Sequence, residues 1–395
     1  MSRTFLLGLA AVVSMMSPPV FRRAEKEFMP ERILLVQLNG LGDLLHTLPA
    51  AAALRRALPE AHLAWAADAR CAELLSAQPW LDEVFAWDRR SWTGFSAFAR
   101  RLRYHNWDMA IDFQGRLRSG FVARLSRARR RIGYLPSLEM SHLFYNEYRP
   151  LESFNSHAVE RNLALIQHLG AAPVTPLERP YLHHLPPAES PDASPWPPLH
   201  VREQDVATVD AWCESRDFDP RREQLVVLNP CARRPAHRWP AARFTQLARR
   251  LLALKGVRVA LAAPVGASSL CDEVAEPLGT AIWRTDGRFH SLALSVFLSR
   301  AAVVVGGDSG LLHLAVASGA VVVGLYGASD AVRRGPYATN ASVVRSGLVC
   351  SPCYAKTCPL GGDPPQCMQE ISVDRVFAAI VSRLRHETRQ VRKSA

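Results

Sequence analysis

A junction between an apolar run and a helix in this sequence brings glycine, acidic and histidine side chains together. It reads GGDSGLLHLAVASG (306–319) and follows the apolar run AAVVV. A helix that starts here has unpaired backbone N–H groups and the positive end of its dipole at the junction. Asp308 suits the N-cap, Ser309 and Gly310 offer backbone donors, and Gly310 lets an anion come close. With His313 one turn further, the stretch predicts an anion site or an ordinary capped helix.

A second junction of this kind lies near the beginning of the chain. It reads QLNGLGDLLHTLP (37–49) and carries glycines at 40 and 42. The dinucleotide-binding fingerprint is incomplete, because Leu45 stands where its third glycine belongs. Asp43 at the helix start would repel a pyrophosphate placed there. It is interpreted either as a stabilising cap or as a carboxylate base that faces a hydroxyl.

The third stretch is basic and reads LNPCARRPAHRWPAARF (228–244). A strand is expected to end at Asn229, and a loop follows. The cationic candidates in that loop are Arg233, Arg234, His237 and Arg238. Such side chains at the end of a strand are well placed for phosphate, and the alternative is a solvated basic loop.

The cysteines form a fourth group. Eight cysteines in 395 residues do not make a secreted disulfide framework. Four of them cluster with the spacing C-x2-C-x4-C-x8-C, at Cys350, Cys353, Cys358 and Cys367. Four thiolates could bind zinc or an iron–sulfur cluster, but a reduced structural loop is the default interpretation. The Asp-x-Asp at 217–219 is interpreted as a turn.

The elements that must position these residues alternate between apolar strands and helices. Such alternation predicts parallel sheets covered by helices on both faces. A helix is expected at 44–59, and the expected strands are 33–38, 62–68, 109–114, 225–230, 257–264, 301–307 and 321–327. Six prolines between Pro186 and Pro198 predict a linker or long surface connection.

The chain is therefore divided into two doubly wound domains. The expected divisions are a disordered extension or overlong start at 1–28, domains at 29–200 and 201–375, and a C-terminal helix and tail at 376–395, with the helix itself expected at 373–387. The apolar stretch near the N-terminus is too short to span a bilayer, and a cytoplasmic protein is expected.

Positive charge is unevenly distributed along the chain. The net charge is +12, and residues 89–131 hold 12 arginines against two acids. That stretch could face phosphates on a substrate, a membrane surface or nucleic acid. The run RARRR (127–131) is too short to argue for nucleic acid by itself.

Taken together, the motifs resemble glycosyltransferase family 9, the lipopolysaccharide heptosyltransferases. The resemblance rests on stretches that occur in the family's order over about residues 31–380. They are ILLVQLNGLGDLLHTLPA, DFQGRLRSG, ARRRIGY, the loop ending in HRWP, GGDSGLLHLAVASGAVVVGLYG, GPY at 335–337 and the cysteine cluster. The combination is more specific than any single motif.

The resemblance implies a GT-B architecture, in which two Rossmann-like domains face each other across a cleft that holds the active site. It implies inverting transfer of heptose from ADP-heptose to a lipopolysaccharide core sugar, with no cofactor required. Asp43 would be the catalytic base. The implied donor-contacting residues, which would hold the diphosphate, are Asp308, Ser309, Gly310 and His313. The expected acceptor-side residues are Gly42, Arg116 and Arg118.

One position departs from the family pattern. The family usually has a lysine two residues before the Trp-Pro pair, where it contacts donor phosphate, and this chain has His237. Arg238 or Arg233 is expected to supply the missing charge. The expected partners are a nucleotide-sugar, an anionic lipopolysaccharide precursor and the inner-membrane surface, without nucleic acid. The alternatives are another nucleotide-sugar donor, a nicotinamide-dependent oxidoreductase, or a basic nucleic-acid-binding protein.

Overall fold

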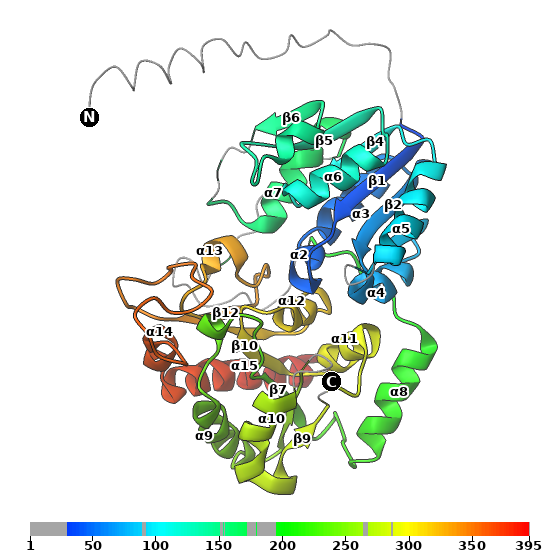
Figure 1. The fold of residues 1–395 in the computed structure, drawn as a ribbon. Helices are drawn as coiled ribbons and strands as arrows, with labels where there is room; N and C mark the ends of the chain where they lie inside the picture. The colour runs from blue at the N-terminus through cyan, green and yellow to red at the C-terminus, as the bar shows by residue number, and fades with distance from the viewer. Residues whose placement is uncertain are drawn as a thin grey trace, which may run out of the picture.

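Two parallel sheets, each covered by helices on both faces, make up the molecule (Figure 1). The computed structural model describes residues 30–88, 92–150, 153, 155–171, 179, 195–263, 268–285 and 287–394. The expected extension at 1–28 and most of the proline-rich connection lie outside the described residues. The predicted α/β, doubly wound GT-B fold class is confirmed.

The N-terminal sheet has the strand order β3-β2-β1-β4-β5-β6. Its strands are β1 (Arg32–Gln37), β2 (His62–Asp68), β3 (Glu83–Trp87), β4 (Met109–Asp112), β5 (Arg130–Leu135) and β6 (Glu147–Pro150). All neighbouring strands in it are parallel. The order reverses between β1 and β4, and ligands bind at such a switch point, beyond the carboxyl ends of the strands.

The C-terminal sheet repeats this order as β12-β11-β10-β7-β8-β9. Its strands are β7 (Gln224–Asn229), β8 (Val257–Leu261), β9 (Trp283–Arg284), β10 (Val303–Gly307), β11 (Val322–Tyr326) and β12 (Ser342–Arg345). Its switch point lies between β7 and β10, where the basic loop and the 306–319 junction begin.

Helices connect the strands of both sheets. In the N-terminal domain they are α2 (Leu41–Leu45), α3 (Leu48–Ala57), α4 (Ala72–Ser76), α5 (Trp92–Tyr104), α6 (Leu117–Leu125) and α7 (Ala158–Ile166). In the C-terminal half they are α8 (Glu203–Glu214), α9 (Ala241–Leu252), α10 (Ser268–Ala275), α11 (Ser291–Ser299), α12 (Gly310–Ala317), α13 (Ala331–Arg334), α14 (Gln366–Glu370) and α15 (Val373–Ser394). The expected C-terminal helix thus begins at Val373 and runs further than 387.

The single helix expected at 44–59 was wrong, because the structure has α2 and α3 in its place. Proline has no N–H and its ring clashes with the carbonyl four residues earlier, so it is tolerated only in the first turn of a helix. Pro49 stands in the first turn of α3, with Thr47 at the N-cap. Asp43 therefore lies in α2, and the apolar residues after Pro49 belong to a separate helix, α3.

Each central strand contributes side chains to two apolar clusters, as alternation along a strand requires. In β1, Ile33 and Leu35 lie in one cluster, while Leu34 and Val36 lie in another. The cluster with Ile33 continues without a break into the C-terminal domain, where it includes Leu312. The two domains thus share one apolar core at their boundary.

None of the helices in the described part of the chain is long and apolar enough to cross a membrane.

Candidate active site at the domain boundary

The start of α12 follows β10 directly and faces the N-terminal domain (Figure 1). Ser309, rather than the expected Asp308, is its N-cap, and the Ser309 hydroxyl accepts a hydrogen bond from the N–H of Leu312 at 3.3 Å. The same hydroxyl accepts from Nδ2 of Asn229, at the end of β7, at 2.8 Å. The Ser309 side chain therefore joins the two strand ends at the switch point.

Asp308 is free for another role because it does not cap the helix. Its carboxylate oxygens lie 3.4 Å from Nε2 of His313 and 3.5 Å from Nδ1 of His237. Burial works to raise the pKa of Asp308, but His313, His237 and Arg334 outweigh it and bring the pKa below its ordinary value. The junction thus holds an ionised carboxylate within a group of nitrogen donors.

The two helix starts predicted to form the site touch each other across the boundary. α2 packs against α12. A Cβ on Gly42 would lie 3.3 Å from the ring of His313, and one on Gly310 would lie 3.1 Å from Cβ of Leu41. The small size of Gly310 therefore lets the N-terminal domain come close at this point. The sequence alone predicts a different role, in which the small residue lets an anion come close.

Asp43 reaches the C-terminal domain through an ion pair. Its Oδ1 lies 3.3 Å from Nη1 of Arg334, the last residue of α13. The side chains of Asp43 and Arg334 are 22% and 46% exposed, so solvent reaches both. Burial works to lower the pKa of Arg334, but Asp43 and Asp308 together raise it above its ordinary value. The expected base therefore lies opposite a cation of the other domain.

Buried histidines join the two domains beside this ion pair. Nε2 of His46 lies 3.3 Å from Nδ1 of His313. Nε2 of His157, at the start of α7, lies 3.0 Å from the carbonyl oxygen of Gly335, and the His157 ring stacks on Tyr337. Burial, together with nearby positive charge, brings the pKa values of His46 and His157 well below the ordinary value. His46 and His157 are therefore uncharged at neutral pH and lie beside the charged site.

His237 occupies the position of the expected lysine and is 5% exposed. Its Nε2 has no hydrogen-bond partner among the described residues. Burial lowers the pKa of His237, and Asp308 opposes that shift. Because Nδ1 faces the Asp308 carboxylate, a neutral His237 ring carries its proton on Nδ1. Its Nε2 then accepts a hydrogen bond and does not donate one, and the ring does not replace the charge of a lysine.

The two arginines expected to compensate for that lysine differ in their surroundings. Nε of Arg238 donates to the carbonyl oxygen of Ala232 at 3.0 Å, which holds its guanidinium on its own loop. Arg233 is exposed, and its Nη1 would lie 3.9 Å from a Cβ on Gly40. Arg233 therefore reaches across the boundary, and Arg238 does not.

Two of the acceptor-side candidates, Arg116 and Arg118, lie at the start of α6, whereas Gly42 lies in α2 with Asp43. Oε1 of Gln114, after β4, accepts from the N–H of Leu38, after β1. Arg116 follows Gln114 closely, and its Nη1 lies 2.5 Å from Oε1 of Glu139. Arg118 is exposed and has no ion pair with any described residue. Both arginines thus lie beyond the carboxyl end of β4, and the Arg116 side chain points to the loop that carries Glu139.

The cysteine cluster lies in the C-terminal domain, on a segment whose Lys356 carbonyl oxygen accepts a hydrogen bond from the N–H of Ala236. Cys350 and Cys353 are exposed, Cys358 is half-buried and Cys367 is buried. Within the described ranges, no group of three or more histidine, cysteine or acidic side chains is arranged to hold a metal ion. Nitrogen donors outnumber the two carboxylates of the site itself, Asp43 and Asp308, and nitrogen donors suit phosphate better than a cation.

Three residues of the site were not predicted from the sequence: Arg334, His46 and His157. Arg334 directly precedes the GPY segment that was part of the family pattern. His46 comes three residues after Asp43, which places both on one side of a helical turn. No local pattern distinguishes His157.

The fold and the site define a class of protein. Two Rossmann-like domains that present their carboxyl sheet edges to each other, with a carboxylate on one side and phosphate-type donors on the other, form a GT-B glycosyltransferase. The model of glycosyltransferase family 9 (heptosyltransferase) matches residues 95–362, and the chain belongs to this family. It is an enzyme, and membership of this family argues against the oxidoreductase and nucleic-acid-binding alternatives.

Known relatives cover nearly all of the chain. Lipopolysaccharide heptosyltransferase 1 of Pseudomonas aeruginosa is 25% identical over an alignment of 347 residues, and this alignment covers 83% of this chain and 87% of the relative. A family 9 glycosyltransferase from Veillonella parvula has a TM-score of 0.77 at 21% identity, over 92% of this chain and 99% of that one. Escherichia coli heptosyltransferase WaaC, solved with ADP, has a TM-score of 0.66 at 22% identity, over 89% and 99%.

Proposed function

We propose that this enzyme transfers heptose from ADP-heptose to an inner-core sugar of a lipopolysaccharide precursor, with inversion at the anomeric carbon. The observation that carries the proposal is the position of Asp43, which faces the cation Arg334 and the Asp308–His313 pair across the domain boundary. The relatives named as lipopolysaccharide heptosyltransferases and the relative solved with ADP support the choice of donor and acceptor.

In the proposed reaction, Asp43 accepts the proton of the acceptor hydroxyl. The hydroxyl oxygen forms a bond to the anomeric carbon of the heptose, and the bond from that carbon to the phosphate oxygen breaks. The electron pair of that bond leaves with ADP. A general base contributes a factor of about 10² to 10⁴ to such a step. Fixed positive groups stabilise the charge that develops on the diphosphate.

The contact between α2 and α12 determines where the diphosphate can lie. No space remains between Gly42 and Gly310, because a single Cβ there would already touch the opposite domain. The proposed position is beside that contact, where Asp308, His237 and Arg334 lie close enough to shift one another's pKa values. The unpaired Nε2 of His237 is available to accept a hydrogen bond from a hydroxyl of the donor at this position.

A transfer assay tests this function. The purified enzyme is incubated with ADP-heptose and a heptose-free lipopolysaccharide core fragment, and the product is identified by mass spectrometry and by the anomeric coupling in its NMR spectrum. UDP-glucose and GDP-mannose run in parallel as donors. A product of inverted configuration with ADP-heptose supports the proposal, and transfer only from another nucleotide-sugar overturns the donor assignment.

We also propose that the enzyme associates with the cytoplasmic face of the inner membrane through one face of the N-terminal domain. Three side chains in and before the short helix η2 (Ser141–Phe144) are exposed, namely Leu138, Met140 and Leu143, at 50%, 61% and 63%. η2 packs on α6, whose Leu117 and Phe121 are exposed as well. Exposed apolar side chains of this kind insert into the boundary between lipid headgroups and acyl chains.

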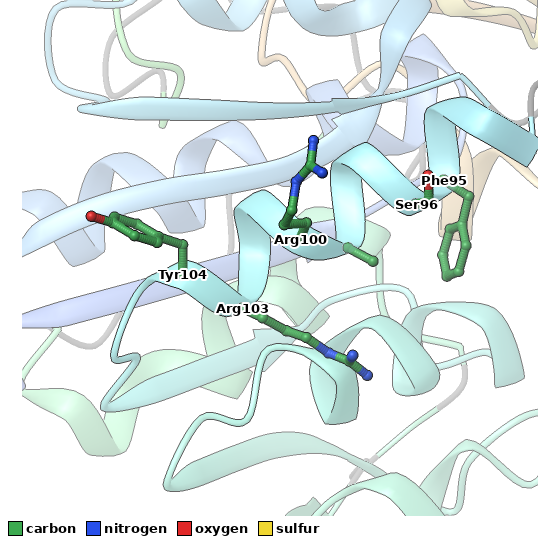
Figure 2. Close-up of a pocket in the computed structure, with 6 residues that line it drawn as sticks. Phe95, Ser96, Arg100, Arg103 and Tyr104 are labelled. Carbon is green, nitrogen blue, oxygen red and sulfur yellow. The ribbon is translucent and has the colours of Figure 1, made fainter.

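Arginines accompany this apolar face, as a contact with anionic lipid requires. The Phe121 ring stacks 6.3 Å from that of Phe95 on α5. Figure 2 shows Phe95 along α5 with Arg100, Arg103 and Tyr104, which line a shallow hollow on this helix. Neither arginine has an ion pair with a described residue. We expect flotation with vesicles that contain phosphatidylglycerol but not with pure phosphatidylcholine. The variant M140E/L143E should lose flotation, whereas L360E, at an exposed leucine of the other domain, should keep it.

A further inference from the structure

We propose that Arg334 is a diphosphate-binding residue of this enzyme, and that in the donor-free state it is held by Asp43. Donor binding then draws the guanidinium from the carboxylate to the phosphates, which frees Asp43 to act as a base. This inference rests on the proposed function, because it assumes that a nucleoside diphosphate leaves at this site.

The position that holds a phosphate-binding lysine in the family pattern carries no cation in this chain. The family pattern places a lysine at the position of His237, and burial lowers the pKa of this histidine, so that the imidazole carries no charge at neutral pH. The diphosphate of a nucleotide-sugar carries two negative charges and gains more when it leaves. A cation from another part of the chain must therefore replace the lysine.

Arg334 is the arginine whose position meets that need. It is close enough to Asp308 and to His237 to affect the pKa values of both. Arg238 is occupied by a carbonyl oxygen of its own loop. The base of the Arg334 side chain is also firmly held, because its carbonyl oxygen accepts a hydrogen bond from the Tyr326 hydroxyl at 3.0 Å. A fixed backbone with a long, half-exposed side chain allows the guanidinium to move between two partners.

In the donor-free state, the guanidinium of Arg334 occupies the Asp43 carboxylate. While this ion pair lasts, Oδ1 of Asp43 is not free to accept the proton of an acceptor hydroxyl. The distance of 3.3 Å between Nη1 of Arg334 and Oδ1 of Asp43 is that of a long hydrogen bond. A diphosphate offers Arg334 more oxygens and more charge than a single carboxylate does, and guanidinium binds such groups in a bidentate manner. Binding of the donor therefore unmasks the base.

The neighbouring arginine provides a matched control. Arg333 lies on the same short helix, and its guanidinium stacks on the ring of Tyr354 at 5.1 Å. It has the same charge as Arg334 and differs by one position. If only the general positive charge matters, loss of either arginine should weaken ADP binding equally. If Arg334 contacts the phosphate directly, only the loss of Arg334 should weaken it.

Calorimetric titration of the full-length enzyme tests the proposal, with ADP as the probe and UDP in parallel. R334M should raise the Kd for ADP about tenfold or more, as the loss of a charge-assisted hydrogen bond predicts. R334K should have a smaller effect, and R333M should bind like the wild type. D43N should lower the Kd two- to fivefold, because Arg334 is then free beforehand. In the R334M background, D43N should have no effect on the Kd.

Two results would overturn the proposal: unchanged binding of ADP by R334M, or D43N that lowers the Kd equally in the presence and absence of Arg334. Circular dichroism spectra confirm that the variants are folded. If the wild-type enzyme binds UDP in place of ADP, the proposed donor is wrong, and the same variants titrated with UDP still decide the role of Arg334.

Discussion

Nε2 of His46 and Nδ1 of His313 lie 3.3 Å apart, and this contact between two buried imidazoles joins the N-terminal to the C-terminal domain. Such a contact needs at least one neutral ring, because two imidazolium ions would repel each other. Burial is the largest cause that lowers the pKa of His46, followed by His313 and His157. His46 is therefore uncharged at neutral pH and supplies the neutral ring that this contact needs.

We predict that the free energy of unfolding decreases as the pH falls below 6.5, the ordinary pKa of histidine. His46 and His157 have lower pKa values in the folded protein than in the unfolded chain, so the unfolded chain binds more protons in that range. Each histidine can contribute up to about 1.4 kcal/mol per pH unit. Thermal unfolding followed from pH 8 to pH 5 measures the effect.

The variant H157N should weaken this dependence on pH. H200N serves as the control, because the His200 side chain is exposed, and its pH dependence should equal that of the wild type. A Tm that stays constant down to pH 5 in the wild type would contradict the prediction.

Asp43→Asn should lower kcat about 10²-fold or more while the fold is kept. The amide has nearly the same shape as the carboxylate, but it cannot accept the proton of the acceptor hydroxyl. Steady-state transfer rates give the result, and unchanged unfolding curves show that structure is retained. Turnover near that of the wild type would show that another group is the base.

Substitutions at the start of α12 should separate capping from domain contact. Ser309→Ala removes the acceptor for the Leu312 N–H and for Asn229, which should cost about 0.5–2 kcal/mol of stability. Gly310→Val should do more, because its side chain would meet Leu41 and the backbone of Gly42. We expect a lower Tm and a loss of ADP binding. If Gly310→Val matches the wild type in both, the contact between the helix starts does not form in solution.

Arg118→Ala should raise the KM for the acceptor and leave the Kd for ADP nearly unchanged. Arg118 is exposed at the acceptor-side sheet edge, whereas Arg116 is paired with Glu139. The effect of Arg116→Ala alone should therefore be smaller, and that of the double variant larger. Acceptor titrations at saturating donor provide the measurement. A weakened Kd for ADP in these variants would mean that the donor and acceptor sides are assigned the wrong way round.

Removal of metal ions should leave the transfer rate unchanged. Arg334 and the start of α12 supply positive charge to the leaving group without a metal ion. The assay compares enzyme dialysed against a chelator with enzyme given Mg²⁺ or Zn²⁺ afterwards. A rate that falls on chelation and returns with one of these ions would show that the reaction uses a metal.

The sequence predicted the central strands well because these strands are apolar on both faces. The expected strand 62–68 coincides with β2, and β1 and β7 each start one residue before the expected strand. Edge strands were missed, since they are short and carry polar side chains; β9 consists only of Trp283 and Arg284. A buried strand can be recognised in the sequence by its continuous apolar run, and an edge strand lacks this pattern.

The candidate site could be predicted only in part, for a related reason. Asp43, Asp308 and His313 each stand at a strand-to-helix junction, which is a local pattern, and the structure places all three at the domain boundary. Arg334 and His46 owe their positions to the way the two domains meet. That arrangement depends on contacts between residues nearly 300 positions apart in the chain, and no local pattern records it.

The close meeting of Gly42 with the start of α12 limits how enzymes of this kind can be recombined. An exchange of the C-terminal half with that of a relative, made in order to change the sugar donor, brings a new surface against Leu41 and Gly42. A partner half with any side chain in place of Gly310 would hold the halves apart, even if its donor site were intact. Successful chimeras will therefore need α2 and α12 from the same parent, with the crossover placed outside this helix pair.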